Sequence, residues 1–219
     1  MSGQLAFDLP SAAAYRRDDF FASPANQAAL AAVEMWQGGK LVLIGPRGAG
    51  KTHLAHIWAE RVGAVWVSGR DLTTVSLPDL AAQGAVVVDD ADAVAGHAEA
   101  ALFHLHNLIE GGHLLLTATT PPRDWGLGLA DLTSRMQAIP VARLQPPDDA
   151  LLSAVLVKLF ADRQVIVAAN LIAYLVTRME RSFASARDLV AVLDRRALAL
   201  GRPISRTLAA EVLDSQTLG

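Results

Sequence analysis

The chain has 219 residues, 52% hydrophobic and 19% charged, with a formal net charge of −3, which excludes wholesale disorder and allows one large domain or a medium and a small one. It has no basic excess that would by itself indicate nucleic-acid binding, no cysteine for a disulfide or a thiolate metal site, and no apolar run of the ~20 residues that a membrane span requires. No secretory signal is visible either, so we expect a soluble, cytoplasmic protein.

The N-terminal segment contains one patterned stretch, Gln4-Leu5-Ala6-Phe7-Asp8-Leu9-Pro10. In an extended conformation this stretch can dock into a groove of a partner, with the Gln4 amide hydrogen-bonded and Leu5, Phe7 and Leu9 in apolar pockets. A frayed terminus or an edge strand would show the same residues. Taken alone, the stretch favours this second interpretation.

The first helix is predicted over residues 26–36, where it ends before two glycines. Ser23 suits its N-cap and Pro24 suits its first turn. Phe20 and Phe21 come just before the helix. We expect them to be packing residues, close enough to the loop that follows to shape an adenine pocket.

The most informative stretch is an apolar run over 41–44 that leads into Gly-Pro-Arg-Gly-Ala-Gly-Lys-Thr over 45–52. The run is typical of a buried parallel strand, and the loop matches G-x-x-x-x-G-K-[ST], which binds nucleotide phosphates through its backbone N–H groups. Lys51 would bind the outer phosphates, Thr52 would ligate Mg²⁺, and a helix over 53–62 would point its N-terminus at the anion. The candidate phosphate-binding residues are Gly45, Pro46, Arg47, Gly48, Ala49, Gly50, Lys51 and Thr52.

Two acids follow a later apolar strand. A short strand is predicted over 64–68, then a small helical patch, then a strand over 85–88 that ends at Asp89 and Asp90. These carboxylates would lie at the carboxyl edge of a parallel sheet, where the phosphates are expected. We predict that Asp89 holds Mg²⁺, directly or through water, and that Asp90 orients or deprotonates the attacking water.

A third strand carries another candidate at its tip. A helix is predicted over 98–110 and the strand over 113–117. A polar side chain after this strand can contact the γ-phosphate or the attacking water. We choose Thr119 over Thr117 for this role.

The remaining patterns are mostly helical. The stretch over 129–136 carries Ser134 and Arg135, and a short strand over 137–141 follows it. Residues 145–149 are typical of a linker with a helix start, and beyond them every pattern is helical. We predict that the following residues form the apolar helix faces: Leu151, Val155 and Leu159; Leu171, Leu175 and Met179; Leu189 and Leu193.

Two clusters of histidine or arginine residues are expected to have a structural role and not a binding role. His53 and His56 are three residues apart on the loop helix, but no third ligand with its own spacing accompanies them, so we expect packed or solvated histidines. Arg195, Arg196 and Arg202 are expected on a solvated helix face. A phosphate loop also serves kinases, but βα units followed by a helical domain favour a motor or switch ATPase.

Several strings together resemble the AAA+ core of the DnaA family of bacterial replication initiators, most closely its shorter, Hda-like regulatory members. The likeness implies an α/β P-loop NTPase core over 18–147 with a five-stranded parallel sheet, an N-terminal tail over 1–17 and an all-helical lid over 148–219. The strings are DDFFASPANQAALAAV, GPRGAGKTHLAHIWAE, VVVDDAD, LFHLHNLIEGGHLLLTATTPPRDW, LADLTSRMQ and ARDLVAVLDRRALALG.

The resemblance also implies residue roles. Residues 45–52 match Walker A, and Asp89 with Asp90 matches Walker B. Thr119 stands at the first sensor position, where the family usually carries a different polar side chain. The resemblance assigns the arginine finger to Arg135, in the SRM string, and the second sensor, on the lid, to Arg187.

The implied function is regulatory. Gln4, Leu5, Phe7 and Leu9 resemble the sliding-clamp-binding peptide of Hda-like proteins, which reverses the interpretation of that stretch given above. Such proteins bind ADP, or ATP with Mg²⁺, and stimulate ATP hydrolysis by DnaA. The chain stops soon after the lid, so we expect no sequence-specific DNA binding, and a homo-oligomer is possible.

Two other functions stay open at this point. One is a self-sufficient ATPase that loads or remodels a DNA-bound replication complex, as helicase loaders do. The other is a nucleotide-gated scaffold in which Arg135 has only a structural role.

Overall fold

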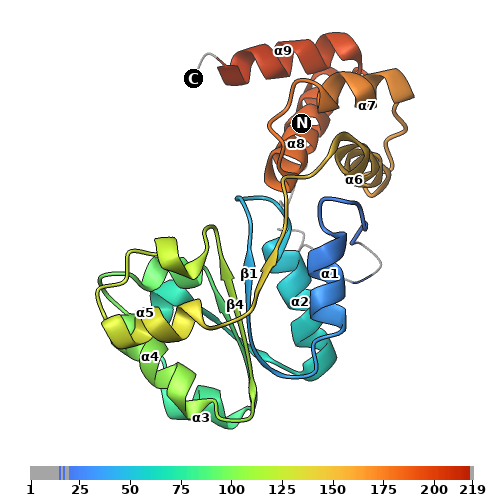
Figure 1. Ribbon diagram of the computed structural model, residues 1–219. Coiled ribbons are helices and arrows are strands. Elements are labelled where there is room, and N and C mark those ends of the chain that lie inside the picture. The colour runs from blue at the N-terminus through green and yellow to red at the C-terminus, as the bar shows by residue number, and fades with distance from the viewer. Residues whose placement is uncertain (1–14, 16, 18–19, 218–219) are drawn as a thin grey trace, which may run out of the picture.

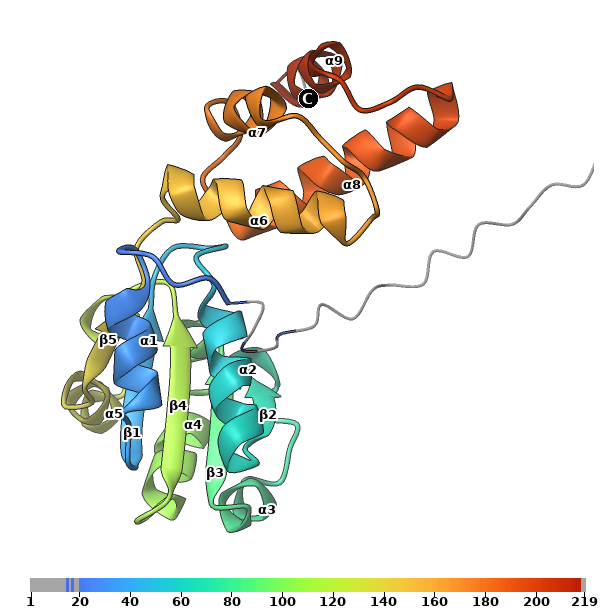
Figure 2. The same ribbon diagram turned by 90° about the vertical axis from the view of Figure 1, so that its right-hand side faces the viewer.

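The computed structural model describes residues 15, 17 and 20–217. One parallel sheet with helices on both faces forms the first part of the fold, and a group formed by the last described helices lies beyond the carboxyl ends of its strands (Figure 1 and Figure 2). Loops that leave the carboxyl ends of the strands therefore face the helical group. These are the loops in which the sequence predicts the phosphate-binding residues.

Five parallel strands form the sheet in the order β2-β3-β4-β1-β5, which confirms the predicted α/β fold. The three central strands are almost entirely buried, as expected of apolar runs covered on both faces. The strands are β1 (Gly39–Ile44), β2 (Val65–Ser68), β3 (Ala85–Asp89), β4 (His113–Ala118) and β5 (Val141–Arg143).

Alternate residues of the strands point to two separate clusters of buried side chains. Leu43 belongs to the cluster under α1 (Gln27–Glu34) and α2 (Lys51–Val62). Ile44, its neighbour, belongs to the cluster under the helices of the opposite face. Those helices are α3 (Leu77–Ala82), α4 (Glu99–Leu108) and α5 (Ala130–Gln137), with the short 3₁₀ helices η2 (Gly69–Asp71), η3 (Ala91–Val94) and η4 (Pro122–Asp124) in the connections.

The C-terminal helices have a core of their own. Asp148 caps the first of them by accepting a 2.7 Å hydrogen bond from the N–H of Leu151. Within the described part of the chain, no helix is both long and apolar enough to cross a membrane. The helices are α6 (Asp149–Ala161), α7 (Ala169–Val176), α8 (Phe183–Leu200) and α9 (Arg206–Thr217).

One predicted face of these helices is wrong by one residue. The core side of α6 is formed by Leu152, Leu156 and Phe160, whereas Val155 and Leu159 are only partly buried. Leu151 is buried but lies outside that core cluster. The faces predicted for the later helices are buried as expected, at Leu171, Leu175, Met179, Leu189 and Leu193.

The first helix begins later than predicted. Ser23 does not cap it, because residues 23–26 form a turn in which the N–H groups of Asn26 and Gln27 both donate to the Ser23 carbonyl. The Asn26 side chain, 2% exposed, accepts from the Ser23 N–H at 2.9 Å and donates to the Phe21 carbonyl at 2.8 Å. This closed arrangement keeps Pro24 in the turn and starts α1 at Gln27.

The last strand is also displaced from its predicted range of 137–141. Gln137 completes α5, and the strand begins at Val141. Pro140 has no N–H to donate, but its carbonyl accepts from the N–H of Val42 at 2.9 Å and so starts the pairing with β1.

Candidate functional site

The glycines of the loop over 45–50 are required by its conformation and its neighbours. Gly48 and Gly50 have φ of +71° and +96°, a region that favours glycine. A Cβ at Gly48 would come within 2.5 Å of the Ser182 Cβ, and one at Gly45 within 2.6 Å of the Leu144 carbonyl oxygen. The loop therefore needs glycine to lie this close to the start of α8 and to the end of the sheet.

Lys51, the first residue of α2, folds its side chain back over this loop. Its ammonium donates to the carbonyls of Gly45 at 2.8 Å and Pro46 at 3.0 Å, and the residue is 7% exposed. An ammonium has three donors, so one remains for a phosphate oxygen. Burial lowers the pKa of Lys51, and the nearby carboxylates of Asp89, Asp90 and Asp92 oppose that shift.

Asp89 and Thr52 bring two oxygen ligands together. The Thr52 hydroxyl lies 3.5 Å from the Asp89 carboxylate, which also accepts a hydrogen bond from the Thr117 hydroxyl. Burial raises the pKa of Asp89, and the Thr117 hydrogen bond partly offsets this. Hydroxyl and carboxylate oxygens suit Mg²⁺, which proteins bind through one or two such groups together with phosphates of the substrate. The residues present therefore fit this ion.

Thr117 is a site residue that the sequence interpretation passed over. It is fully buried on β4, and its hydroxyl joins the two acids by donating to Asp89 and accepting the Asp90 N–H at 3.0 Å. Asp90 itself is held in the left-handed region, with φ of 52°. A threonine near the end of a strand, directly after three leucines, was the available signal.

Thr119, the residue preferred from the sequence, lies beside a third acid. Its N–H donates to the Asp92 carboxylate at 2.8 Å and its hydroxyl donates to the same oxygen. Asp92 was not predicted as a site residue either, although it also acts on Lys51. The carboxyl edge of the sheet thus carries two threonine–aspartate pairs beside the loop.

The helical group contacts the same loop. The N–H of Phe183, the first residue of α8, donates to the Gly48 carbonyl at 2.9 Å, and Ser182 caps that helix. Arg187 lies one turn further along α8 and is exposed. Phe20 is buried near Gly50 and contacts the ring of His53, as expected of a packing residue.

Arg135 lies apart from these residues. It is exposed near the end of α5 and shares a pocket with Gly39 and Lys40, the first residues of β1, at the opposite edge of the sheet. Its guanidinium carbon is 5.3 Å from the centre of the Phe103 ring. No hydrogen bond or ion pair joins it to another described residue.

The described residues include the predicted pair His53 and His56 but not the N-terminal stretch. Gln4, Leu5, Phe7 and Leu9 lie outside the described residues. The ring of His56 is stacked between Tyr15 and Trp66, with ring centres 4.5 and 4.1 Å away. Over residues 15, 17 and 20–217, no three histidine or acidic side chains converge on a common metal position.

The fold recurs in solved structures, although no protein-family model matches the chain. Domain III of the Thermotoga maritima replication initiation protein DnaA is 19% identical, with a TM-score of 0.78 over 92% of this chain and 96% of that one. AMPPCP-bound DnaA from Aquifex aeolicus is 14% identical, with a TM-score of 0.69 over 82% of this chain. The Thermotoga maritima RuvB Holliday junction branch migration motor is 20% identical, with a TM-score of 0.65 over 86% of this chain.

These likenesses differ in their extent. The chain spans nearly all of the DnaA domain, but only 64% of the Aquifex aeolicus DnaA chain and 65% of the RuvB chain. At sequence identities of 14–20%, a structural likeness shows the fold alone. The chain therefore has the α/β fold seen in domain III of DnaA and in RuvB.

Proposed function

We propose that this protein binds ADP or ATP, with Mg²⁺, on the loop over 45–52. The observation that carries the proposal is the position of the Lys51 ammonium, which two loop carbonyls hold in place with one donor left over. Two glycines with positive φ shape the loop so that backbone N–H groups can face an anion. The solved structure of AMPPCP-bound DnaA has the same fold.

Each residue at this edge of the sheet then has a role. Lys51 binds the outer phosphates, while Thr52 and Asp89 hold Mg²⁺, which neutralises phosphate charge when bound. Asp90 orients or deprotonates the attacking water, and Thr119 acts as the sensor at the strand tip. In this proposal the core covers 18–147, and the helices over 148–219 are a lid that brings Arg187 to the phosphates.

We propose further that the protein regulates DnaA. Arg135 enters the active site of ATP-loaded DnaA and neutralises the charge that develops on the transferring phosphoryl group. Its exposure, and the absence of any described carboxylate paired with it, support a role on another molecule. Gln4, Leu5, Phe7 and Leu9 bind the sliding clamp and so hold the protein near DNA.

A second function is favoured by a different observation. Asp89 and Asp90 are both present next to Lys51, and Thr117 holds the two acids in place. This arrangement suits ATP hydrolysis by the chain itself, as in a helicase-loader-like ATPase. Strong turnover by the isolated protein with DNA present would favour this function over the regulatory one.

The decisive experiment measures hydrolysis by ATP-loaded DnaA with and without clamp loaded on DNA. We expect wild-type protein to accelerate hydrolysis only when the clamp is loaded, and Gln4→Ala and Arg135→Ala to abolish the acceleration. An Arg135→Ala protein that still binds ADP and clamp, yet accelerates DnaA fully, would reduce Arg135 to a structural residue. An unaffected Gln4→Ala protein would remove the role of the clamp peptide.

A further inference from the structure

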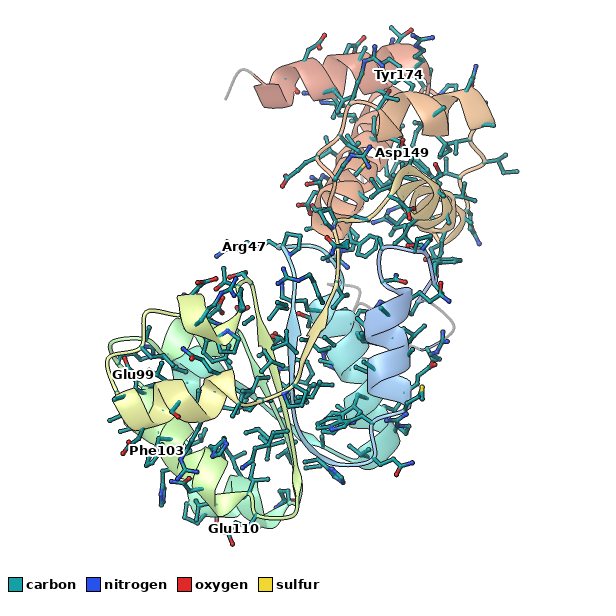
Figure 3. All side chains as sticks on the ribbon, viewed as in Figure 1. Arg47, Glu99, Phe103, Glu110, Asp149 and Tyr174 are labelled. Atoms are coloured by element: carbon teal, nitrogen blue, oxygen red, sulfur yellow. The ribbon has the colours of Figure 1, made fainter. Side chains whose placement is uncertain are left out.

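A second pocket lies at the amino edge of the sheet, away from the phosphate loop. Its volume is about 530 Å³, and it lies between the start of β1, the end of α4 and the end of α5. Figure 3 labels Phe103, which lies on α4, and Glu110, which lies in the connection after α4 and is part of the pocket lining. The charged and titratable side chains of the lining are Lys40, His106, Glu110 and Arg135.

Lys40 is held in this pocket by one strong hydrogen bond. Its ammonium donates to the His106 carbonyl at 2.7 Å and lies 3.4 Å from the Nδ1 atom of the same residue. The carbonyl belongs to the last turn of α4, where a cation is favourable. Because an ammonium has three donors, at least one is left for a ligand in the pocket.

Positive charge dominates the pocket. Burial and the Arg135 guanidinium lower the pKa of Lys40, and Glu110 opposes them more weakly. Burial is also the main cause that lowers the pKa of His106, followed by the charge of Lys40. The cations of Lys40 and Arg135 thus repel each other, and Glu110 is the one acid in the described pocket lining. An anion between them would relieve this repulsion.

Arg135 contacts α4 directly, and α4 also anchors the start of α5, the helix that carries Arg135. The face of its guanidinium lies over Phe103, so the N–H groups at its edge stay available for hydrogen bonds. The Glu99 carboxylate accepts the N–H groups of Gly128 at 3.1 Å and Leu129 at 2.7 Å, directly before α5. The Phe103 contact and the anchored start of α5 therefore favour this position of the guanidinium in the free protein.

We propose that this pocket binds a phosphoryl group, with Lys40 as a second cation beside Arg135. The inference rests on the proposed function, in which Arg135 enters the active site of ATP-loaded DnaA. The phosphoryl group is then part of the nucleotide bound there. A planar guanidinium and a compact ammonium contact different oxygens of one tetrahedral anion. Lys40 is then a direct ligand of the transferring group.

The test compares four variants in the assay with ATP-loaded DnaA and clamp loaded on DNA. Lys40→Gln removes the charge but keeps a donor for the His106 carbonyl, and Lys40→Arg keeps the charge. Arg135→Ala tests the proposed function itself. Lys158→Gln is the matched control, because Lys158 is a lysine of α6 that pairs with Asp162 at 2.9 Å.

We expect Lys40→Gln to lower the maximal stimulation about tenfold, Lys40→Arg to restore most of it, and Lys158→Gln to leave it unchanged. ADP affinity and melting temperature should match wild type in every variant that is compared. If Arg135→Ala abolishes stimulation and Lys40→Gln does not lower it, the role of Lys40 is wrong and the proposed function stands. If Arg135→Ala has no effect, both fail. If Lys40→Arg loses as much stimulation as Lys40→Gln, the charge of Lys40 is not what matters and its proposed role is wrong. The role is also wrong if the control Lys158→Gln loses as much stimulation as Lys40→Gln.

Discussion

The side chains at the carboxyl edge of the sheet form two hydrogen-bonded groups. The Thr117 hydroxyl bonds to Asp89 and to the Asp90 backbone, while Thr119, among the described residues, bonds to Asp92. A buried hydroxyl that satisfies a carboxylate and an N–H group is costly to remove, because both partners lose a hydrogen bond inside the protein. The two threonines should therefore respond differently to the same substitution.

Thr117→Val is expected to lower the free energy of unfolding by about 1–3 kcal/mol and to weaken Mg²⁺-dependent nucleotide binding. The change keeps the shape of the side chain but leaves the buried Asp89 carboxylate without its donor. Urea denaturation and nucleotide titration with and without Mg²⁺ measure the two effects. Thr119→Val, near Asp92, is the control and should leave Mg²⁺ dependence closer to wild type. Equal behaviour of the two variants would show that Thr117 does not organise the metal ligands.

Sequence reasoning could not decide which of the two threonines contacts Asp89, and the reason is physical. The motif around Lys51 was identifiable because its glycines, lysine and threonine have fixed spacing. In contrast, which threonine near the end of β4 contacts Asp89 depends on the register between strands, in which Val88 pairs with Leu116. That register arises from tertiary packing and is not encoded in local spacing.

At the scale of elements, the strands were the most predictable. Long apolar runs fall on β1, β3 and β4 because both faces of these strands are buried. The start of α1 was mistaken because the Asn26 side chain closes a turn that competes with an earlier helix start. The pocket around Lys40 had no signal in the sequence, because its residues come from three elements.

The anchoring of α5 by Glu99 gives a prediction at this scale. Glu99→Ala should lower the free energy of unfolding by about 1 kcal/mol at neutral pH, because the N–H groups of Gly96, Gly128 and Leu129 lose their acceptor. These bonds lower the pKa of Glu99 in the folded protein below its value in the unfolded chain. The stabilisation is therefore complete above the unfolded pKa and is lost as pH falls through the folded one.

Denaturation of the wild type and of Glu99→Ala, at neutral and at strongly acidic pH, measures this pH dependence of the free energy of unfolding. The difference between the two proteins should be largest at neutral pH and should shrink on acidification. A Glu99→Gln protein should lie between them, because its amide oxygen still accepts a hydrogen bond. A difference that is independent of pH would mean that the Glu99 charge does not contribute.

At the scale of the whole molecule, the helical group and the sheet meet at the phosphate loop. Figure 2 shows the start of α8 and the end of the sheet on the same side of the molecule, and the Phe183 N–H bonds to the Gly48 carbonyl. A ligand bound to that loop therefore lies where the sheet and the helical group meet. A ligand that binds the folded protein and not the unfolded chain raises the stability of the fold.

Gly48→Ala should disturb this meeting point. The added Cβ would come within 2.5 Å of the Ser182 Cβ, so either the loop or α8 must move. Gly126→Ala is a matched control, since its φ of +70° is close to the +71° of Gly48 but no atom lies within 4 Å of its new Cβ. Both changes strain the backbone by about 1 kcal/mol, but only Gly48→Ala should lower nucleotide affinity by tenfold or more. Equal nucleotide affinities, measured by calorimetry, would contradict the contact between α8 and the loop.

The central claim is that the loop over 45–52 binds a nucleoside polyphosphate through Lys51. Calorimetric titration of the full chain with ADP and Mg²⁺ tests it most directly. We expect one equivalent to bind to wild type and none to bind to Lys51→Met, which should retain the wild-type circular dichroism spectrum. Wild-type protein that binds no nucleotide, or a folded Lys51→Met protein that binds as wild type does, would contradict it.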